Sequence, residues 1–356
     1  MNGNELIKGI NFISKEKGIS EEKIFEYLEQ ALAVALKRQL KISSDVRVEV
    51  DRDTGEMKAF SFYTVIDDEV EEINFDTEII HEEAVLTDPD IKVGDRLEER
   101  LNTENFGRLA ASTAKQVLTG KIRDEIRTLI FEEYKDKIGE LIIGNVMMED
   151  NYNYYIELNK INAKLPKGEL IPNEKIIIGS QIKSVIKYVN ETTKGPEIIL
   201  SRKSDDFVKR LIELEIPEFI DGIVYLYNIA RIPGVRTKIA VYSNNPNVDP
   251  IGACIGERGS RISSIIKELS GEKIDIIRYV EENSEFIKNA LSPAKDIQVI
   301  VTDEEERHCY AVCDQDNLSL AIGKKGSNVS LASRLTRFKI EIKTKEDMSE
   351  LGINLL

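Results

Sequence analysis

The 356-residue chain has little cysteine and no long apolar run, and both absences narrow what it can be. Its three cysteines, Cys254, Cys309 and Cys313, are too few for a disulfide framework, and their spacing fits no common zinc site. The absence of a run of about 18 apolar residues argues against a membrane-spanning helix. The N-terminus lacks a basic stretch followed by an apolar one, so no secretory signal is predicted. We therefore expect a reducing, cytoplasmic location.

The neighbourhood of His308, Cys309 and Cys313 allows two interpretations. The three side chains could form a metal cluster. Alternatively, Cys309 and Cys313 are two buried residues on one face of a strand, because they lie four positions apart. We prefer the second interpretation, and predict neither a metal site nor a cofactor.

The sequence also lacks an overall excess of basic residues: 49 Lys and Arg face 64 Asp and Glu, a net charge of −15. Residues 1–138 hold 20 basic and 31 acidic residues, whereas residues 139–356 hold 29 and 33. The stretch 324–345 reverses the sign, with seven basic residues and one acidic residue. An acidic front suggests a protein partner with a basic surface, or it serves only to keep that domain soluble.

A short glycine motif occurs twice. The first copy is Ile255-Gly256-Glu257-Arg258-Gly259-Ser260, and the second is Ile322-Gly323-Lys324-Lys325-Gly326-Ser327. Each copy lies between two short amphipathic helical patterns and precedes a β-rich run. A Gly-x-x-Gly turn in this setting is typical of KH domains, which hold the backbone of single-stranded nucleic acid. Two copies in one chain make RNA binding the leading hypothesis.

The residue types in both copies suit a phosphate group. A β-carbon at either glycine would obstruct an approaching backbone and forbid the turn. The turn also opens a helix, whose free N–H groups and positive end favour an anion. Apolar neighbours can floor a groove for bases, and one matched polar residue in each copy could contact sugar or base edges. The predicted RNA-binding residues are Ile255, Gly256, Arg258, Gly259, Arg261 and Ile262, with Ile322, Gly323, Lys324, Lys325, Gly326, Asn328 and Val329.

An alternative is that the glycines serve only the geometry of a joint between two helices. Two copies in matched surroundings, both with basic central residues, favour the binding interpretation. Neither copy is a P-loop, because that motif requires a glycine where Leu318 stands. Glu257 places a carboxylate near the expected phosphate path, so the first turn should attract phosphate less strongly than the second.

The patterns around the two turns repeat one element order, α-β-β-α-α-β, which is the bacterial arrangement of the KH fold. The first repeat predicts a helix over 205–214, strands over 222–232, 236–242 and 273–279, and helices on both sides of the turn. The second predicts a helix over 285–291, strands over 296–302, 307–313 and 338–343, and again two helices around the turn.

Between the acidic front and the first repeat, short β runs predict a small Greek-key barrel of the OB type; they cover 141–148, 152–158, 163–166, 181–189 and 197–201. The loop 164–172 resembles that of the S1 RNA-binding variant. Tyr152, Tyr154 and Tyr155 could stack on bases or be ordinary sheet residues. Tyr154 and Tyr155 must point to opposite faces of their strand.

The front itself has a mixed α/β pattern. Ser20 caps a predicted helix with an apolar stripe, and Asp53-Thr54-Gly55 joins predicted strands over 46–50 and 57–66. Residues 67–99 hold 14 acidic residues against two basic ones. A second long helix is predicted over 107–138.

Several stretches closely resemble the NusA family of bacterial transcription factors; they are Leu200-Ser201-Arg202, Glu215-Ile216-Pro217-Glu218, Ile229-Ala230-Arg231, the run from Pro233 to Val241, the run from Asn247 to Cys254, and Gly271-Glu272-Lys273-Ile274-Asp275-Ile276. The resemblance covers essentially the whole chain and is most specific from Leu200 to Tyr279. It implies a multidomain α+β chain: an N-terminal RNA polymerase-binding domain over 1–138, an S1 domain over 139–202, and two tandem type II KH domains over 203–282 and 283–350.

The resemblance further implies a regulator of transcription elongation, pausing, termination and antitermination without catalytic residues. Its expected partners are RNA polymerase, nascent single-stranded RNA and other elongation or antitermination factors. We expect a monomer with no membrane contact. Two departures from the family pattern are Arg337-Phe338, where relatives usually have Gly-Trp, and an end at Leu356, which predicts that acidic C-terminal repeats are lacking.

Two other functions are considered. An S1–KH ribonuclease needs clustered acids and a metal, and the acids of 67–99 have only His81 nearby. A ribosome-associated or RNA-chaperone S1/KH protein should be strongly basic, whereas this chain is acidic.

Overall fold

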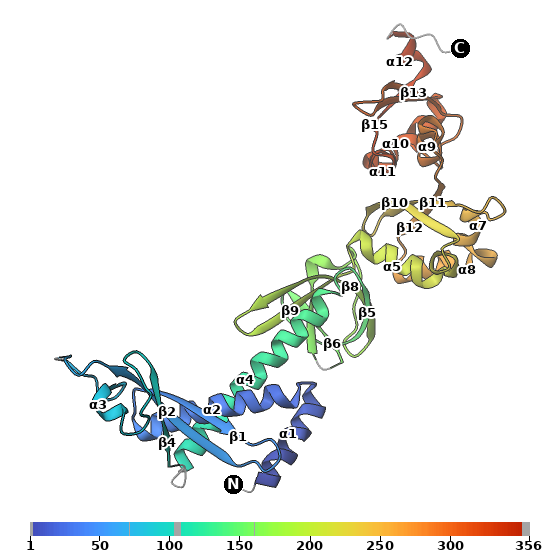
Figure 1. Ribbon diagram of the computed structural model, residues 1–356. Coiled ribbons are helices and arrows are strands. Elements are labelled where there is room, and N and C mark those ends of the chain that lie inside the picture. Colours follow the sequence, from blue (N-terminus) through green and yellow to red (C-terminus); the bar gives the residue numbers. More distant parts are fainter. Residues whose placement is uncertain (1–2, 71, 103–107, 160, 351–356) are drawn as a thin grey trace. The chain divides into compact units, whose positions relative to one another are not determined.

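The computed structural model describes residues 3–70, 72–102, 108–159 and 161–350 (Figure 1). Contacts divide the chain into two compact units. One comprises the chain up to Glu133 together with 193–196, and the other comprises the rest. Within the described stretches, no helix combines the length and apolar character needed to cross a membrane.

The N-terminal unit combines helices with a four-stranded sheet. β2 lies in the middle of this sheet: β1 and β3 pair with one edge of β2 at different positions along it, and β4 pairs with the opposite edge. The elements of the unit are α1 (Gly3–Lys17), α2 (Glu21–Leu40), β1 (Asp45–Val50), β2 (Met57–Ile66), β3 (Glu78–Ile80), α3 (His81–Ala84), β4 (Arg96–Leu101) and α4 (Arg108–Lys135).

Helix α2 forms as its sequence pattern predicts. Ser20 is its N-cap and accepts a hydrogen bond from the Lys23 N–H. Its apolar stripe, including Ile24, Leu28 and Ala31, is buried and packs against Val48 and its neighbours in β1. The hairpin of β1 and β2 and the long helix α4 are also confirmed, whereas α1, β3, α3 and β4 were not anticipated.

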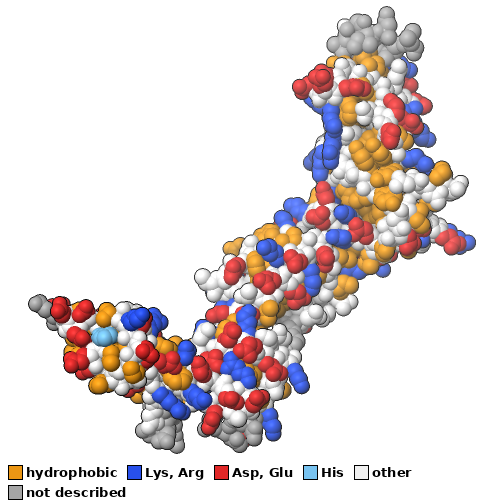
Figure 2. All heavy atoms as spheres, viewed as in Figure 1, with side chains coloured by type: hydrophobic (Ala, Val, Ile, Leu, Met, Phe, Trp, Pro, Cys, Tyr) orange, Lys and Arg blue, Asp and Glu red, His pale blue; other side chains and the backbone are white. Residues whose placement is uncertain are grey.

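The acidic segment after β2 is folded. Val65, Ala84, Ile91 and Leu97 form a small core beneath it. Figure 2 shows acidic side chains gathered over the α3 end of this unit. The acidic charge of the front therefore lies on an ordered surface.

The second unit begins with the five-stranded barrel that the sequence predicts, and the structure closes it with the strand order β5-β6-β7-β9-β8. Gly144 allows the strands to close, because a β-carbon there would lie 2.5 Å from Ile156 Cγ2 and 2.7 Å from the Glu157 carbonyl oxygen. The elements are β5 (Leu141–Glu149), β6 (Asn153–Leu158), β7 (Ile161–Pro166), the 3-10 turn η1 (Lys167–Glu169), β8 (Gln181–Thr192) and β9 (Gly195–Ser201).

Two modules of the same design follow, and both confirm the predicted α-β-β-α-α-β order. In each module the first two strands are antiparallel and the third is parallel to the second. The first comprises α5 (Asp205–Glu215), α6 (Pro217–Ile220), β10 (Val224–Ile232), β11 (Arg236–Ser243), α7 (Pro250–Ile255), η2 (Glu257–Gly259), α8 (Ser260–Glu268) and β12 (Lys273–Arg278). The second comprises α9 (Asn283–Ala290), β13 (Gln298–Asp303), β14 (His308–Cys313), α10 (Gln315–Ile322), η3 (Lys324–Gly326), α11 (Ser327–Thr336), β15 (Lys339–Thr344) and α12 (Lys345–Glu350).

The cores of this unit join its modules. Ala230 and Ala240 of the first module's sheet share one core with Ile287 and Leu331 of the second module. Hydrogen bonds support this contact: Asn228 Nδ2 donates to the Leu335 carbonyl at 2.7 Å. The second module thus covers the sheet face of the first that faces away from α5 and α8.

The cysteines are core residues. Cys309 and Cys313 are buried on β14, which confirms the interpretation of two apolar residues on one strand face. Burial raises the pKa of the Cys309 thiol to about 11 and that of Cys254 to about 12. No group of three His, Cys, Asp or Glu side chains suitable for a metal occurs in the described part of the chain.

Candidate nucleic-acid interface

Each Gly-x-x-Gly motif forms a tight turn between two helices. The first turn joins α7 to α8, and the second joins α10 to α11. The two turns have nearly the same backbone: φ is +73° at Gly256 and +74° at Gly323, with ψ near 180° at both. The structure therefore gives both sequence copies one local geometry.

The two glycines of a turn are required for different reasons. A β-carbon on Gly323 would lie 2.7 Å from both the backbone nitrogen and the β-carbon of Asn328. One on Gly256 would lie 2.6 Å from Arg261 Cγ. Gly259 and Gly326 also have positive φ, but a β-carbon on Gly326 would meet nothing within 4 Å, and one on Gly259 would make only an ordinary contact with Ser263 Oγ at 3.9 Å. That open space lets another backbone approach the second glycine of each turn.

The helices that follow the turns have no side-chain cap. Gly259 is the N-cap of α8 and Gly326 is the N-cap of α11, and neither supplies a side chain to the first N–H groups. Uncapped N–H groups at the positive end of a helix can donate to a phosphate oxygen. The bound anion would thus lie where the glycines leave room.

The predicted basic side chains surround this position. Arg258, Lys324 and Lys325 are exposed, and none forms an ion pair with any described residue. Glu257 is exposed beside Arg258. The second turn consequently presents two free positive charges, while the first presents one positive and one negative charge.

The apolar residues beside the turns are partly open to solvent. Ile255 is 39% exposed and Ile322 is 36% exposed, while Ile262 and Val329 are half-buried. They are accessible, as a floor for bases would require.

Arg261 is held by protein contacts. Its Nη1 donates to Glu218 Oε2 and to the Ala253 carbonyl, each at 2.7 Å. These bonds tie the start of α8 to α6 and to α7. Arg261 therefore supports the first turn, and its charge is already paired.

Asn328 does not reach the surface, although it matches Arg261 in sequence. It is 1% exposed, and its Nδ2 donates to the carbonyls of Leu291, Leu320 and Ala321 at 2.9–3.2 Å. The expected contact with sugar or base edges is not available to a side chain in this position. Asn328 instead ties the second turn to the end of α9.

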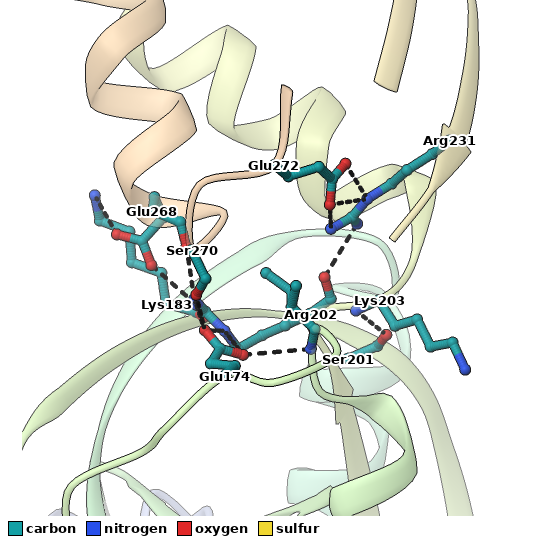
Figure 3. Close-up of polar contacts among 10 residues, drawn as sticks. Glu174, Lys183, Ser201, Arg202, Lys203, Arg231, Glu268, Ser270 and Glu272 are labelled. Atoms are coloured by element: carbon teal, nitrogen blue, oxygen red, sulfur yellow. Dashed lines mark hydrogen bonds and ion pairs between the residues drawn. The ribbon is translucent and has the colours of Figure 1, made fainter. Parts of the chain in front are cut away.

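Arg202 links the barrel to the first module, a role that the sequence reasoning missed (Figure 3). Its guanidinium pairs with Glu174 of the barrel at 2.5 Å and with Glu268 of α8 at 2.9 Å. It also lies 4.7 Å from the centre of the Phe207 ring. In the sequence Arg202 stands out only as part of the stretch Leu200-Ser201-Arg202, and a lone arginine at a module boundary carries no signal of its partners.

A second buried ion pair lies beside the first. Arg231 and Glu272 are fully buried and bond through Arg231 Nε and Nη2 at 2.9–3.2 Å. Arg231 Nη1 also donates to the carbonyl of Arg202 at 3.0 Å. The two pairs form one network that joins the barrel, the linker and the first module.

The barrel tyrosines have different environments. Tyr152 is 77% exposed, whereas Lys167 lies over the Tyr154 ring at 5.2 Å. The Tyr155 hydroxyl donates to Asp150 Oδ2 at 2.8 Å. Tyr152 is the tyrosine of the three that is most open for stacking on a base.

Comparison with known proteins supports this architecture. The model of the NusA N-terminal domain matches residues 5–128. The models of the NusA-like first and second KH domains match residues 202–279 and 283–350, so each turn lies inside a KH match. A Bacillus subtilis protein is 44% identical over 349 residues, which cover 98% of this chain and 93% of the relative. The chain belongs to the NusA family.

Other NusA proteins match over a similar span. One from Halalkalibacterium halodurans is 43% identical over 351 residues, covering 98% of this chain and 90% of the relative. One from Thermus thermophilus is 39% identical over 353 residues, covering 96% and 90%. All three relatives bear the name transcription termination/antitermination protein NusA.

Proposed function

We propose that this NusA-family chain is a non-catalytic, RNA-binding regulator of transcription elongation, pausing, termination and antitermination. Residues 1–138 dock on RNA polymerase in the cytoplasm, and the S1 domain (139–202) and the KH domains (203–282 and 283–350) hold nascent single-stranded RNA. The chain acts as a monomer and cooperates with other elongation or antitermination factors. The names of the curated relatives support the transcriptional role.

The geometry of the turns is the observation that carries the RNA-binding part. Each turn combines an uncapped helix N-terminus, open space over its second glycine, and free basic side chains. A phosphate that enters this space meets N–H donors and positive charge together. Exposed Ile255 and Ile322 lie directly before the turns, where a base can rest.

The acidic front supports the polymerase-binding part. Its net charge of −11 makes an RNA contact there unfavourable and favours a basic protein surface. An N-terminal unit that holds the polymerase, followed by modules that hold RNA, would keep emerging RNA close to the enzyme. This arrangement raises the local concentration of RNA at the turns.

The RNA site is tested by reversing the charge of the second turn. The double variant Lys324→Asp, Lys325→Asp should bind single-stranded RNA more weakly, because two phosphate contacts are lost. The slope of log K against log salt should become shallower by about 1.4, at roughly 0.7 per phosphate of single-stranded RNA.

The matched control is Lys8→Asp, Lys15→Asp on α1, which makes the same change in net charge at exposed positions outside the turns. It should leave the slope unchanged. An unaltered slope in the Lys324, Lys325 variant would show that RNA does not pass the second turn.

A further inference from the structure

Strand β1 has an open edge. Among the described residues it pairs with β2 alone, in a register that sets Val46 opposite Ser61 and Val48 opposite Ala59. At the end of the hairpin the Asp51 N–H donates to the Glu56 carbonyl at 2.8 Å. Because main-chain groups alternate along an antiparallel strand, Val46, Val48 and Val50 direct their N–H and C=O groups away from β2.

Side chains already imitate a neighbouring strand at one end of this edge. The Val50 N–H donates to Glu29 Oε1 at 2.9 Å, and Arg52 Nη1 donates to the Val50 carbonyl at 2.6 Å. Arg52 and Glu29 are also bonded to each other. Within the described chain, the equivalent groups of Val46 and Val48 have no such partners.

A groove runs along the same edge. A cavity of about 580 Å³ is lined by residues of β1 and by the turn that follows it, including Asp51 and Glu56. A second cavity of about 220 Å³ lies between β1 and the face of α2 that bears Glu26, Gln30 and Ala33. The two cavities adjoin, because they share Glu29, Arg47 and Val48. Figure 1 shows α2 lying alongside β1.

We propose that this groove binds an extended, positively charged peptide segment of RNA polymerase, which adds to β1 as a further strand. The inference rests on the proposed docking of the N-terminal unit on the polymerase, and it specifies the mode of recognition. The free N–H and C=O groups of Val46 and Val48 would bond to the main chain of the segment.

The acidic groove favours a peptide segment with a positive net charge. Its walls carry five acidic side chains and three basic ones. Arg47 and Arg52 are engaged in ion pairs with Glu98, Glu22 and neighbouring acids. In the described part of the chain Glu26 and Glu56 have no ion-pair partner, and neither has Lys58. The free carboxylates therefore outnumber the free ammonium group, and they remain available to lysine or arginine side chains of the ligand.

Amide hydrogen exchange on the full chain, at residue resolution, tests the proposal. In the free protein the amides of Val46 and Val48 should exchange quickly, while those of Arg47 and Glu49, which face β2, exchange slowly. The probe is the acetylated and amidated peptide Lys-Val-Lys-Val-Lys-Val-Lys. Saturating probe should slow Val46 and Val48 at least tenfold. The same peptide with alternate N-methyl groups cannot form the ladder and should give no protection.

A charge variant separates the groove from general attraction to an acidic protein. Glu26→Lys should weaken probe binding about fivefold or more, whereas Glu82→Lys on α3, outside the groove, should change it little. Both residues are exposed, so neither change disturbs the core.

The same exchange measurement on the complex with RNA polymerase is the second part of the test. Polymerase that binds and slows exchange at Val46 and Val48 supports the proposal. Polymerase that binds but leaves both amides unprotected overturns strand addition and leaves the docking function intact. Absence of polymerase binding would instead contradict the proposed function, and the probe peptide would still decide whether the edge accepts a strand.

Discussion

At the scale of single residues, the two glycines of each turn differ in why a side chain is excluded at their position. Gly323 combines φ of +74° with ψ of 168°, a conformation that only glycine adopts readily. Gly326 has φ of +74° and ψ of 11°, which other residues adopt at a cost. The first glycine therefore serves folding, while the second leaves space for the ligand.

Alanine substitutions should separate these two roles. Gly323→Ala should destabilise the second KH module by about 3 kcal/mol, because of backbone strain and the close approach to Asn328. Gly326→Ala should cost only about 1–2 kcal/mol, the price of a left-handed backbone. Its methyl group would nevertheless enter the phosphate path, so RNA affinity should fall well beyond the loss of stability.

Urea unfolding and RNA titration of the two variants measure both effects. Equal stability losses, or an unchanged RNA affinity for Gly326→Ala, would contradict this division between the glycines.

Arg261 and Asn328 mark the limit of sequence matching at this scale. Their positions after the two turns correspond, which predicted a shared contact with RNA. In the structure Arg261 pairs with Glu218, and Asn328 is buried against main-chain carbonyls. The orientation of a side chain depends on the residues packed around it, and many of those residues are distant in sequence.

At the scale of elements, the ion pairs around Arg202 connect the barrel to the first KH module. Arg202 and Glu174 are almost fully buried, and the guanidinium also donates to the carbonyls of Lys183 and Glu268. A buried pair with its remaining groups satisfied defines one geometry of the two elements, and the loss of one partner leaves a buried charge alone.

Arg202→Ala should therefore destabilise the second unit by about 3–5 kcal/mol. Arg127→Ala is the control, because Arg127 pairs with Asp124 of its own helix at a partly exposed position and should cost about 1 kcal/mol or less. Chemical denaturation of both variants gives the comparison. Similar losses for the two arginines would show that the joint around Arg202 adds no special stability.

The hairpin between β5 and β6 should respond to acid. Asp150 accepts hydrogen bonds from the Tyr152 N–H, the Tyr155 hydroxyl and the Asn153 N–H, which lower its pKa to about 2. A depressed folded-state pKa contributes stability above the unfolded value of about 3.9, and this contribution disappears as the pH falls toward 2. Protection of the hairpin amides should accordingly decrease between about pH 4 and pH 2.

Removal of one donor tests the cause of this shift. Tyr155→Phe should raise the pKa of Asp150 toward its ordinary value, as followed by NMR of the carboxyl carbon. Tyr188→Phe, an exposed tyrosine elsewhere in the barrel, should leave that pKa unchanged. A pKa of Asp150 that does not move in Tyr155→Phe would rule out the hydroxyl as a contributor.

At the scale of the whole molecule, the acidic segment and the two Gly-x-x-Gly turns lie in different compact units. The acidic excess of the front comes from residues 67–99, which belong to the unit that extends to Glu133. The acidic unit contains the β1 groove, and the second unit contains both turns. Polymerase binding and RNA binding should therefore be separable.

Removal of residues 1–133 should abolish polymerase binding and preserve single-stranded RNA binding within about twofold. Polymerase pull-down and RNA titration report the two activities, and circular dichroism checks that the remaining unit is folded. Polymerase capture by the shortened chain would contradict the assignment of docking to the N-terminal unit.

The sequence by itself determined the repeated and local features of this protein. Periodicity and turn residues predicted α2, the β1–β2 hairpin, the five barrel strands and both α-β-β-α-α-β repeats, because these signals depend on near neighbours. Elements with short or weakly patterned sequences, such as α1, β3 and β4, escaped prediction. The Gly-x-x-Gly turns were evident because their backbone conformation demands glycine at fixed positions.

Only the tertiary structure decided which side chains meet. It buried Asn328, paired Arg202 with Glu174, and left the edge of β1 beside an open groove. These outcomes depend on contacts between residues that lie far apart in sequence, such as Arg202 and Glu268. Long-range contacts determine which side chains are buried and which strand edges are open, so local sequence patterns do not predict these features.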